Sequence, residues 1–183
     1  MPNVTSYEAT IQSIKDGGIP TLGVSIGSKT VNLGTKLTKS ETRSTPTLTL
    51  PPSFGDESAY TVIALDIDAP FISFNFLSPI VHWVQTDLKL STTQAEGSEA
   101  GLKLETSEAP VIPWLPAGPP PGAAPHRYIF LLHNQEKEVK SELKRKKIGK
   151  LSRMRFDLGK MIDDLELKGG AGGFVAGNWF VAN

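Results

Sequence analysis

Short apolar runs separated by frequent glycine and proline are the feature that most limits how this chain can fold. The 183 residues include 17 Gly and 14 Pro, which interrupt helices and favour short strands joined by turns. The runs between them are rich in β-branched and apolar residues, as central strands are. We therefore predict a mainly β fold. The predicted strands cover 21–26, 30–33, 47–50, 60–66, 81–88, 127–133 and 174–181.

Two segments have the residue spacing of an amphipathic helix. Tyr7, Ile11 and Ile14 recur at intervals of four and three residues, which predicts a helix over 6–15. Four apolar residues with the same kind of spacing predict a second short helix over 157–165.

The chain has the length and organisation of one domain. Domains usually contain about 100–200 residues, and the sequence has no internal repeat. We interpret 1–183 as a single domain with an N-terminal extension over 1–20. The polar stretch 91–101 is predicted to be a surface-loop insertion. The proline-rich stretch 114–125 is predicted to be an ordered loop, because proline lacks the N–H that a sheet needs.

Composition and charge narrow the possible functions. Lys plus Arg and Asp plus Glu both number 19, so no overall field attracts nucleic acid or an anionic membrane. The absence of cysteine excludes disulfides, cysteine zinc sites and a cysteine nucleophile. No apolar run approaches the ~20 residues that cross a bilayer, and the first residues lack a secretory signal. We therefore expect a soluble, cytoplasmic monomer, in which the basic run 137–155 is a solvated helix and turn rather than a membrane or nucleic-acid patch.

Polar side chains occur where the predicted central strands end. Asp66 and Asp68 follow one strand and, being two residues apart, are expected to face the same side. His126 and Tyr128 share a face at the start of another strand, and His82 stands near the start of a third. Antiparallel neighbours bring such ends to the same edge of a sheet. The sequence thus predicts a small polar pocket lined by these five side chains.

Three kinds of chemistry are open to such a pocket. Carboxylates beside the two imidazoles raise their pKa and favour their protonated forms, which with Tyr128 could hold an anion. The same groups could also act in acid–base catalysis or bind zinc. No serine or cysteine nucleophile is positioned by a motif. We therefore expect a binding protein rather than an enzyme, without a metal or cofactor.

Four ordered blocks of the sequence resemble the phosphatidylethanolamine-binding protein family. They are Asp66-Ile67-Asp68-Ala69-Pro70, Val81-His82-Trp83, Gly118-Pro119-Pro120 leading to His126-Arg127-Tyr128, and Phe156-Asp157-Leu158 leading to Gly177-Asn178-Trp179-Phe180. The third block is the most specific. Together the blocks cover roughly residues 21–183, and their order and spacing make a chance match very improbable.

The resemblance has implications for both fold and ligand. It implies an antiparallel Greek-key β-sandwich with a few short peripheral helices, and a cis bond between Ala69 and Pro70. It also implies a pocket for a small anion such as phosphate, a phospholipid head group or a carboxylate. The ligand-binding residues carried over by motif are Asp66, Asp68, His82, Pro120, His126 and Tyr128.

The resemblance also implies possible partners. One branch of the family inhibits a vacuolar serine carboxypeptidase, and the N-terminal extension of this chain is compatible with that role. The alternative is a scaffold or modulator of protein kinase signalling. We expect a non-catalytic protein that regulates a partner enzyme such as a serine carboxypeptidase.

This chain departs from the family pattern near the predicted mouth of the pocket. Ile67 stands between the two acids, where the family has proline. The segment Phe71–Leu77 is apolar, where relatives often have a charged loop, and Ala123-Ala124-Pro125 precedes His126. An apolar loop at this place could pack on the loop around Trp114, cap the pocket, or dock a partner or a lipid tail.

Overall fold

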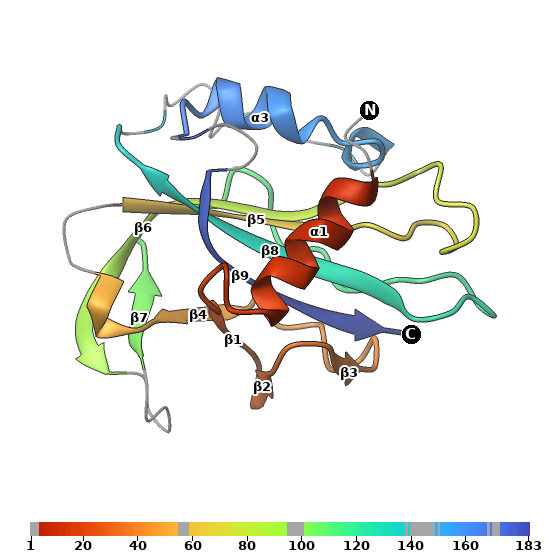
Figure 1. The fold of residues 1–183 in the computed structure, drawn as a ribbon, viewed down its shortest axis with the longest axis horizontal. Coiled ribbons are helices and arrows are strands. Elements are labelled where there is room, and N and C mark those ends of the chain that lie inside the picture. The colour runs from red at the N-terminus through yellow and green to blue at the C-terminus, as the bar shows by residue number, and fades with distance from the viewer. Residues whose placement is uncertain are drawn as a thin grey trace.

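The computed structural model describes residues 4–54, 59–94, 101–137, 139, 149, 151–167, 169 and 173–183 (Figure 1). The strands are β1 (Gly23–Ile26), β2 (Lys29–Val31), β3 (Thr35–Leu37), β4 (Thr47–Leu50), β5 (Ala59–Asp66), β6 (Ile80–Gln94), β7 (Leu102–Glu105), β8 (His126–Gln135) and β9 (Phe174–Ala182). The helices are α1 (Val4–Lys15) and α3 (Leu158–Asp164), with single 3-10 turns η1 (Pro52–Phe54) and η2 (Leu151–Arg153).

The strands form one large mixed sheet. Their order is β2-β1-β4-β7-β6-β5-β8-β9-β3, and all neighbours are antiparallel except β3 and β9. The sheet curls so far that it nearly closes into a barrel (Figure 1), and Asn178 of β9 donates hydrogen bonds to the carbonyls of Leu22 and Val31 on the β1–β2 side. The mainly β class is therefore confirmed. The predicted antiparallel Greek-key sandwich is corrected to a continuous mixed sheet.

The long strand β6 makes the sheet continuous. Its first part pairs with β5 as far as Leu88, and from Lys89 it pairs with β7. The register shifts at the crossover, where Asp87 has a φ of 58°, as the extra residue of a β-bulge can. Gln135 of β8 holds this bend, since its side chain accepts from the Asp87 N–H at 2.9 Å and donates to the Asp87 carboxylate at 2.6 Å. The bend lets one strand serve both halves of the sheet.

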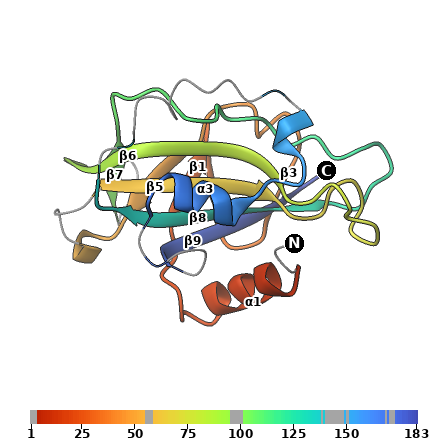
Figure 2. The same cartoon turned by 90° about the horizontal axis from the view of Figure 1, so that it is seen from above.

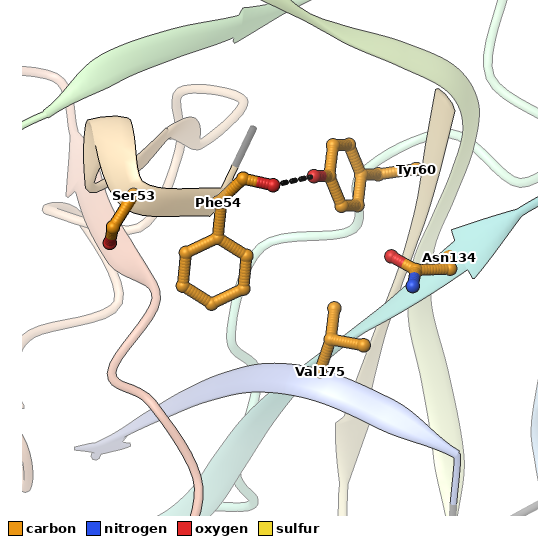
Figure 3. A pocket seen from close by; sticks show the side chains of 5 residues that line it. All are labelled: Ser53, Phe54, Tyr60, Asn134 and Val175. Atoms are coloured by element: carbon orange, nitrogen blue, oxygen red, sulfur yellow. Dashed lines mark hydrogen bonds between the residues drawn. The ribbon is translucent and has the colours of Figure 1, made fainter. Parts of the chain in front are cut away.

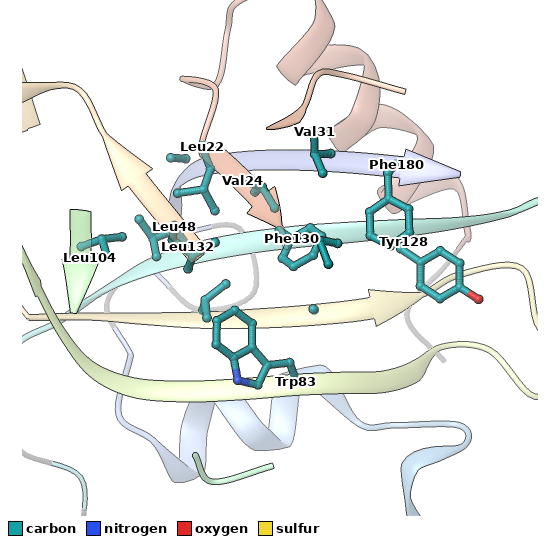
Figure 4. Close-up of a cluster of buried hydrophobic side chains, with 14 of the residues drawn as sticks. Leu22, Val24, Val31, Leu48, Trp83, Leu104, Tyr128, Phe130, Leu132 and Phe180 are labelled. Carbon is teal, nitrogen blue, oxygen red and sulfur yellow. The ribbon is translucent and has the colours of Figure 1, made fainter. Parts of the chain in front are cut away.

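Each face of the sheet buries its own hydrophobic cluster. Alternate residues of β8 point to opposite faces, so Tyr128 and Phe130 enter the cluster inside the curled sheet, which Figure 4 shows. Ile129 and Leu131 enter the cluster on the outer face. Figure 2 shows α3 lying across that outer face, above β5 and β8. The alternation along β5 and β8 thus builds two cores from one sheet.

Helix α1 lies against β9, and its predicted apolar face is buried. Tyr7, Ile11 and Ile14 are all buried, as the spacing predicts. The close approach favours a glycine in β9, because a Cβ on Gly177 would lie 2.7 Å from the end of the Ile14 side chain and 3.2 Å from the Phe130 carbonyl oxygen. The helix begins at Val4, two residues before the predicted start.

The other predicted elements are largely present. The seven predicted strands correspond to β1, β2, β4, β5, β6, β8 and β9, and the second predicted helix corresponds to α3. Asp157 caps α3 by accepting the Lys160 N–H at 2.9 Å. Strands β3 and β7 were not predicted. The stretch 114–125 is a loop without strands, as predicted, and the Ala69–Pro70 bond is cis.

Two predictions fall partly outside the described residues. The predicted loop over 91–101 is wrong at its start, because β6 continues to Gln94, and residues 95–100 lie outside the described ranges. Most of the basic run 137–155 also lies outside them. Within the described part of the chain, no helix is long and apolar enough to span a bilayer.

Candidate functional site

The predicted polar residues meet at one edge of the sheet. In the ladder between β5 and β8, Asp66 lies opposite Tyr128, and β5 also pairs Asp66 with Ile80, close to His82 in β6. The three neighbouring strand ends therefore bring Asp66, His82, His126 and Tyr128 together. These side chains are only 1–3% exposed, so they form a nearly closed polar cluster rather than an open pocket.

His126 is held between two oxygen acceptors. Its Nδ1 lies 2.9 Å from a carboxylate oxygen of Asp66, and its Nε2 lies 3.0 Å from the carbonyl oxygen of Pro70. Both ring nitrogens therefore act as donors, as they do in an imidazolium. Burial alone lowers the pKa of His126, but the hydrogen bond and the charge of Asp66 outweigh it and raise that pKa. His126 and Asp66 thus form a buried ion pair.

Asp68 does not share the side of Asp66, which corrects the expectation from their spacing. Its carboxylate accepts from the backbone N–H of Arg127 at 2.8 Å and from the Arg127 guanidinium at 2.8 and 2.7 Å. The reason is that β5 ends at Asp66, so strand alternation no longer applies two residues later. Asp68 ties the turn after β5 to β8, and its own N–H donates to Asp66.

His82 is oriented by a backbone carbonyl. Its Nδ1 donates to the carbonyl oxygen of Leu115 at 2.6 Å, which leaves Nε2 as the acceptor of a neutral ring. The ring stands edge-on to Tyr128, with 5.0 Å between ring centroids. Burial lowers the pKa of His82, against smaller opposing effects of Leu115 and Asp66. The direction of this shift favours a neutral His82, whereas the sequence predicts that both imidazoles are protonated.

Tyr128 contributes a buried hydroxyl that interacts with the Asp66 side chain and the Gly118 backbone. Burial raises the pKa of Tyr128, and the charge of Asp66 raises it further, so the hydroxyl stays protonated. The backbone of Gly118 lies near enough to act on this hydroxyl. Pro120 belongs to the same proline-rich loop, but its carbonyl accepts from Ala123 in a local turn.

Arg153 is a member of the site that the sequence did not reveal. Its buried guanidinium donates to the carbonyl oxygens of Val81 and His82 at 3.3 Å and of Pro113 at 3.0 Å. No carboxylate pairs with it among the described residues. Burial lowers the pKa of Arg153. In the sequence this arginine is one of many basic residues in a run, and nothing in the pattern distinguishes it.

The segment Phe71–Leu77 forms an exposed apolar loop next to the cluster. It follows directly on Pro70, whose carbonyl accepts from His126. Phe74 is 65% exposed, and Phe71, Ile72 and Phe76 are also exposed. The Trp114 ring packs inward against Phe130.

A separate cavity of about 330 Å³ lies at the other end of the strands (Figure 3). Its lining residues are Ser53, Phe54, Tyr60, Asn134 and Val175. Tyr60 is near the start of β5 and Asn134 near the end of β8, whereas the polar cluster lies at the opposite ends of these strands. Over the described residues, no group of three or more histidine or carboxylate side chains is placed to hold a metal ion.

Comparisons with known proteins agree with the motifs and the fold. The sequence model of the phosphatidylethanolamine-binding protein family matches residues 27–170. The carboxypeptidase Y inhibitor of Saccharomyces cerevisiae is 33% identical over 92 residues, which are 47% of this chain and only 42% of that protein.

Solved structures resemble almost the whole chain. A carboxypeptidase Y inhibitor, crystallised in complex with its cognate proteinase, is 27% identical, with a TM-score of 0.68 and coverage of 96% of this chain and 95% of that one. A phosphatidylethanolamine-binding protein from Plasmodium vivax shares the fold at 20% identity, with a TM-score of 0.59 and coverage of 94% and 96%. Since the family match extends over most of the sequence, this chain belongs to the phosphatidylethanolamine-binding protein family.

Proposed function

We propose that this chain is a non-catalytic binding protein that inhibits a serine carboxypeptidase. The observation that carries this proposal is its similarity to a carboxypeptidase Y inhibitor, both in sequence and over nearly the full length of a structure solved with the cognate proteinase. The polar cluster supports binding rather than catalysis. Its acid and one imidazole bond to each other, and its second imidazole is held by a backbone carbonyl.

We propose that the apolar loop Phe71–Leu77 is the surface that contacts the carboxypeptidase. Four of its large apolar side chains are exposed, whereas nearly all others in the described part of the chain are buried or half-buried. The rings of Phe74 and Phe76 contact each other, with centroids 4.9 Å apart, and form one continuous apolar surface. Aromatic side chains of this kind commonly dominate the binding energy of protein interfaces.

An inhibition assay with loop variants tests this proposal. We expect the protein to slow peptide hydrolysis by a serine carboxypeptidase, and Phe74→Ser combined with Phe76→Ser to weaken inhibition by about tenfold or more. Leu151→Ser is the matched control, because Leu151 is 81% exposed but lies outside the loop. Absence of inhibition at micromolar protein would overturn the proposal. An equal loss of inhibition in the loop variant and in Leu151→Ser would show that the loop is not the binding surface.

Deletion of the N-terminal extension is a poorer test. Tyr7, Ile11 and Ile14 of α1 are buried against the rest of the fold. Removing residues 1–16 would expose that surface and destabilise the protein, whatever its role in inhibition. The loop variants avoid this because their side chains point to solvent.

We also propose that the polar cluster binds a small anion, such as phosphate, a phosphorylated head group or a carboxylate. The supporting observation is the buried Arg153 next to His82, whose guanidinium bonds to carbonyl oxygens and to no carboxylate among the described residues. Because the cluster is almost closed, only a small group can enter it. Phosphate titration followed by NMR of the histidine rings is the test. Unchanged shifts of both His82 and His126 would overturn this second proposal.

A further inference from the structure

The cavity lined by Tyr60 and Asn134, here called the Tyr60 cavity, lies beside an irregularity in the sheet. In the ladder between β8 and β9, Leu132 pairs with Ala176. The next pair is His133 with Phe174, which leaves Val175 as an extra residue in β9. An extra residue of this kind bends its strand and can redirect its side chain. Val175 lines the cavity of about 330 Å³ and packs against the inner cluster, so the cavity lies where β9 departs from regular pairing.

Two consecutive amide side chains at the end of β8 differ in their hydrogen bonding. The Gln135 oxygen accepts from the Thr61 hydroxyl at 2.8 Å and from the Asp87 N–H at 2.9 Å. Its nitrogen donates to the Asp87 carboxylate at 2.6 Å and to the Lys137 carbonyl at 3.0 Å, so this amide is fully used. The Asn134 side chain makes no hydrogen bond to a described residue. Strand alternation turns Asn134 to the face of the inner cluster, where its amide lines the Tyr60 cavity and is available to a ligand.

The other lining side chains limit the charge and shape of a ligand. Figure 3 shows the rings of Phe54 and Tyr60 and the Val175 side chain around the same space as the Asn134 amide. The Tyr60 hydroxyl donates to the Phe54 carbonyl at 3.5 Å, which joins η1 to β5. None of the described lining residues carries a charge, so an ion would lose hydration there without gaining a partner of opposite charge. Aromatic walls favour a planar ring as the occupant.

We propose that the Tyr60 cavity binds an uncharged aromatic molecule that carries a carboxamide or an equivalent pair of neighbouring N–H donor and carbonyl acceptor. The Asn134 amide contains both a donor and an acceptor, so it can form two hydrogen bonds with such a group. The aromatic ring of the ligand packs against Phe54 and Tyr60. Small-molecule sites have volumes of about 300–1,000 Å³, so this cavity suits a ligand of about one or two rings. The cavity lies at the strand ends opposite the polar cluster and is separate from the proposed anion site.

Three benzene derivatives of nearly the same shape test this inference on the full chain. Benzamide has the ring and the carboxamide, acetophenone has a methyl group in place of the amide nitrogen, and benzoate is charged. We expect benzamide to bind with a dissociation constant on the order of 1 mM, as suits so small a molecule. It should bind about tenfold more tightly than acetophenone or benzoate. NMR titration measures these affinities, and the Asn134 side-chain amide and the Val175 backbone amide should shift.

Variants of the lining residues separate the hydrogen bonds from the ring contact. Asn134→Leu keeps the approximate shape of the side chain and should lower the affinity for benzamide to that for acetophenone. Phe54→Ala removes one aromatic wall and should weaken both. Asn32→Leu is the matched control, because Asn32 is exposed and does not line the cavity, and it should leave every affinity unchanged.

Three outcomes would overturn the inference. Equal affinity of benzamide and acetophenone for the unchanged protein would show that no amide pairing occurs. Shifts concentrated on His82 and His126 would place the ligand in the polar cluster instead. Undiminished binding of benzamide to Asn134→Leu would exclude the Asn134 amide as its partner.

Discussion

His126 depends on Asp66 for its charge. In Asp66→Asn the ring loses its charged hydrogen-bond partner, so burial dominates and we expect the pKa of His126 to fall below its usual value near 6.5. The pH titration of the His126 ring in NMR spectra measures this. Asp68→Asn is the control, because Asp68 bonds to Arg127 and contributes least to His126. An unchanged titration in Asp66→Asn would contradict the ion pair.

The raised pKa of His126 also makes the stability of the fold depend on pH. A histidine whose pKa is higher in the folded state stabilises the fold below its unfolded value, and this contribution is lost as pH rises through the folded value. We therefore expect the free energy of unfolding to decline above about pH 6.5. Urea titrations across this range should show the decline in the parent protein and a weaker decline in Asp66→Asn.

His133 makes the stability of the fold depend on pH in the opposite direction, with a loss at acid pH. Its ring is fully buried, neither nitrogen bonds to a described residue, and burial lowers the pKa of His133 to about 4. The unfolded chain therefore binds a proton more readily, so stability falls as pH drops from about 6.5 towards 4. In His133→Leu we expect this loss to shrink and the free energy of unfolding near pH 7 to rise by about 1 kcal/mol. Urea unfolding at both pH values is the measurement. A lower free energy of unfolding of the variant at both pH values would indicate that the His133 ring has a hydrogen-bond partner.

Asn178 joins the two sides of the curled sheet through its side chain. From β9, its side-chain amide donates to the carbonyl of Leu22 at 2.7 Å and to that of Val31 at 3.0 Å. Asn178→Ala leaves two buried carbonyls without their donor, so we expect a loss of about 2–4 kcal/mol in the free energy of unfolding. Asn134→Ala is the matched control, since Asn134 is only half-buried. Equal effects of the two changes in chemical denaturation would refute this role.

The elements that could be predicted from sequence are those with a repeated pattern. β5 and β8 have long apolar runs, and α1 has three apolar residues at helical spacing, so their type followed from local periodicity. β3 and β7 contain only three and four residues and owe their existence to their neighbours β9, β4 and β6. The continuous sheet also depends on the bulge at Asp87, which no local signal marked.

The site could be predicted only where it lies within strands. The meeting of Asp66, His82, His126 and Tyr128 followed from strand ends and family motifs. The turn of Asp68 towards Arg127 and the burial of Arg153 did not, because both depend on contacts between distant segments. The orientation of each histidine ring likewise depends on carbonyls from other segments, those of Pro70 and Leu115.

Two hydrophobic clusters share one sheet in the whole molecule, so we expect them to unfold together. Phe130 of β8 is fully buried in the inner cluster, and Phe130→Ala should lower the free energy of unfolding by about 3–5 kcal/mol. Trp83 reports on the inner cluster and Trp179 on the outer one. Tryptophan fluorescence and far-ultraviolet circular dichroism should give coincident transitions in parent and variant. Separate transitions would mean that the clusters are independent.

The bond from His126 to Pro70 links the charge of the cluster to the surface of the molecule. A neutral His126 has one proton to share, so one nitrogen must turn a lone pair towards either the Asp66 carboxylate or the Pro70 carbonyl. Either arrangement is repulsive, and the second loosens the residue from which Phe71–Leu77 extends. The protonation of His126 thus affects how firmly the fold holds Pro70, the residue next to the exposed loop.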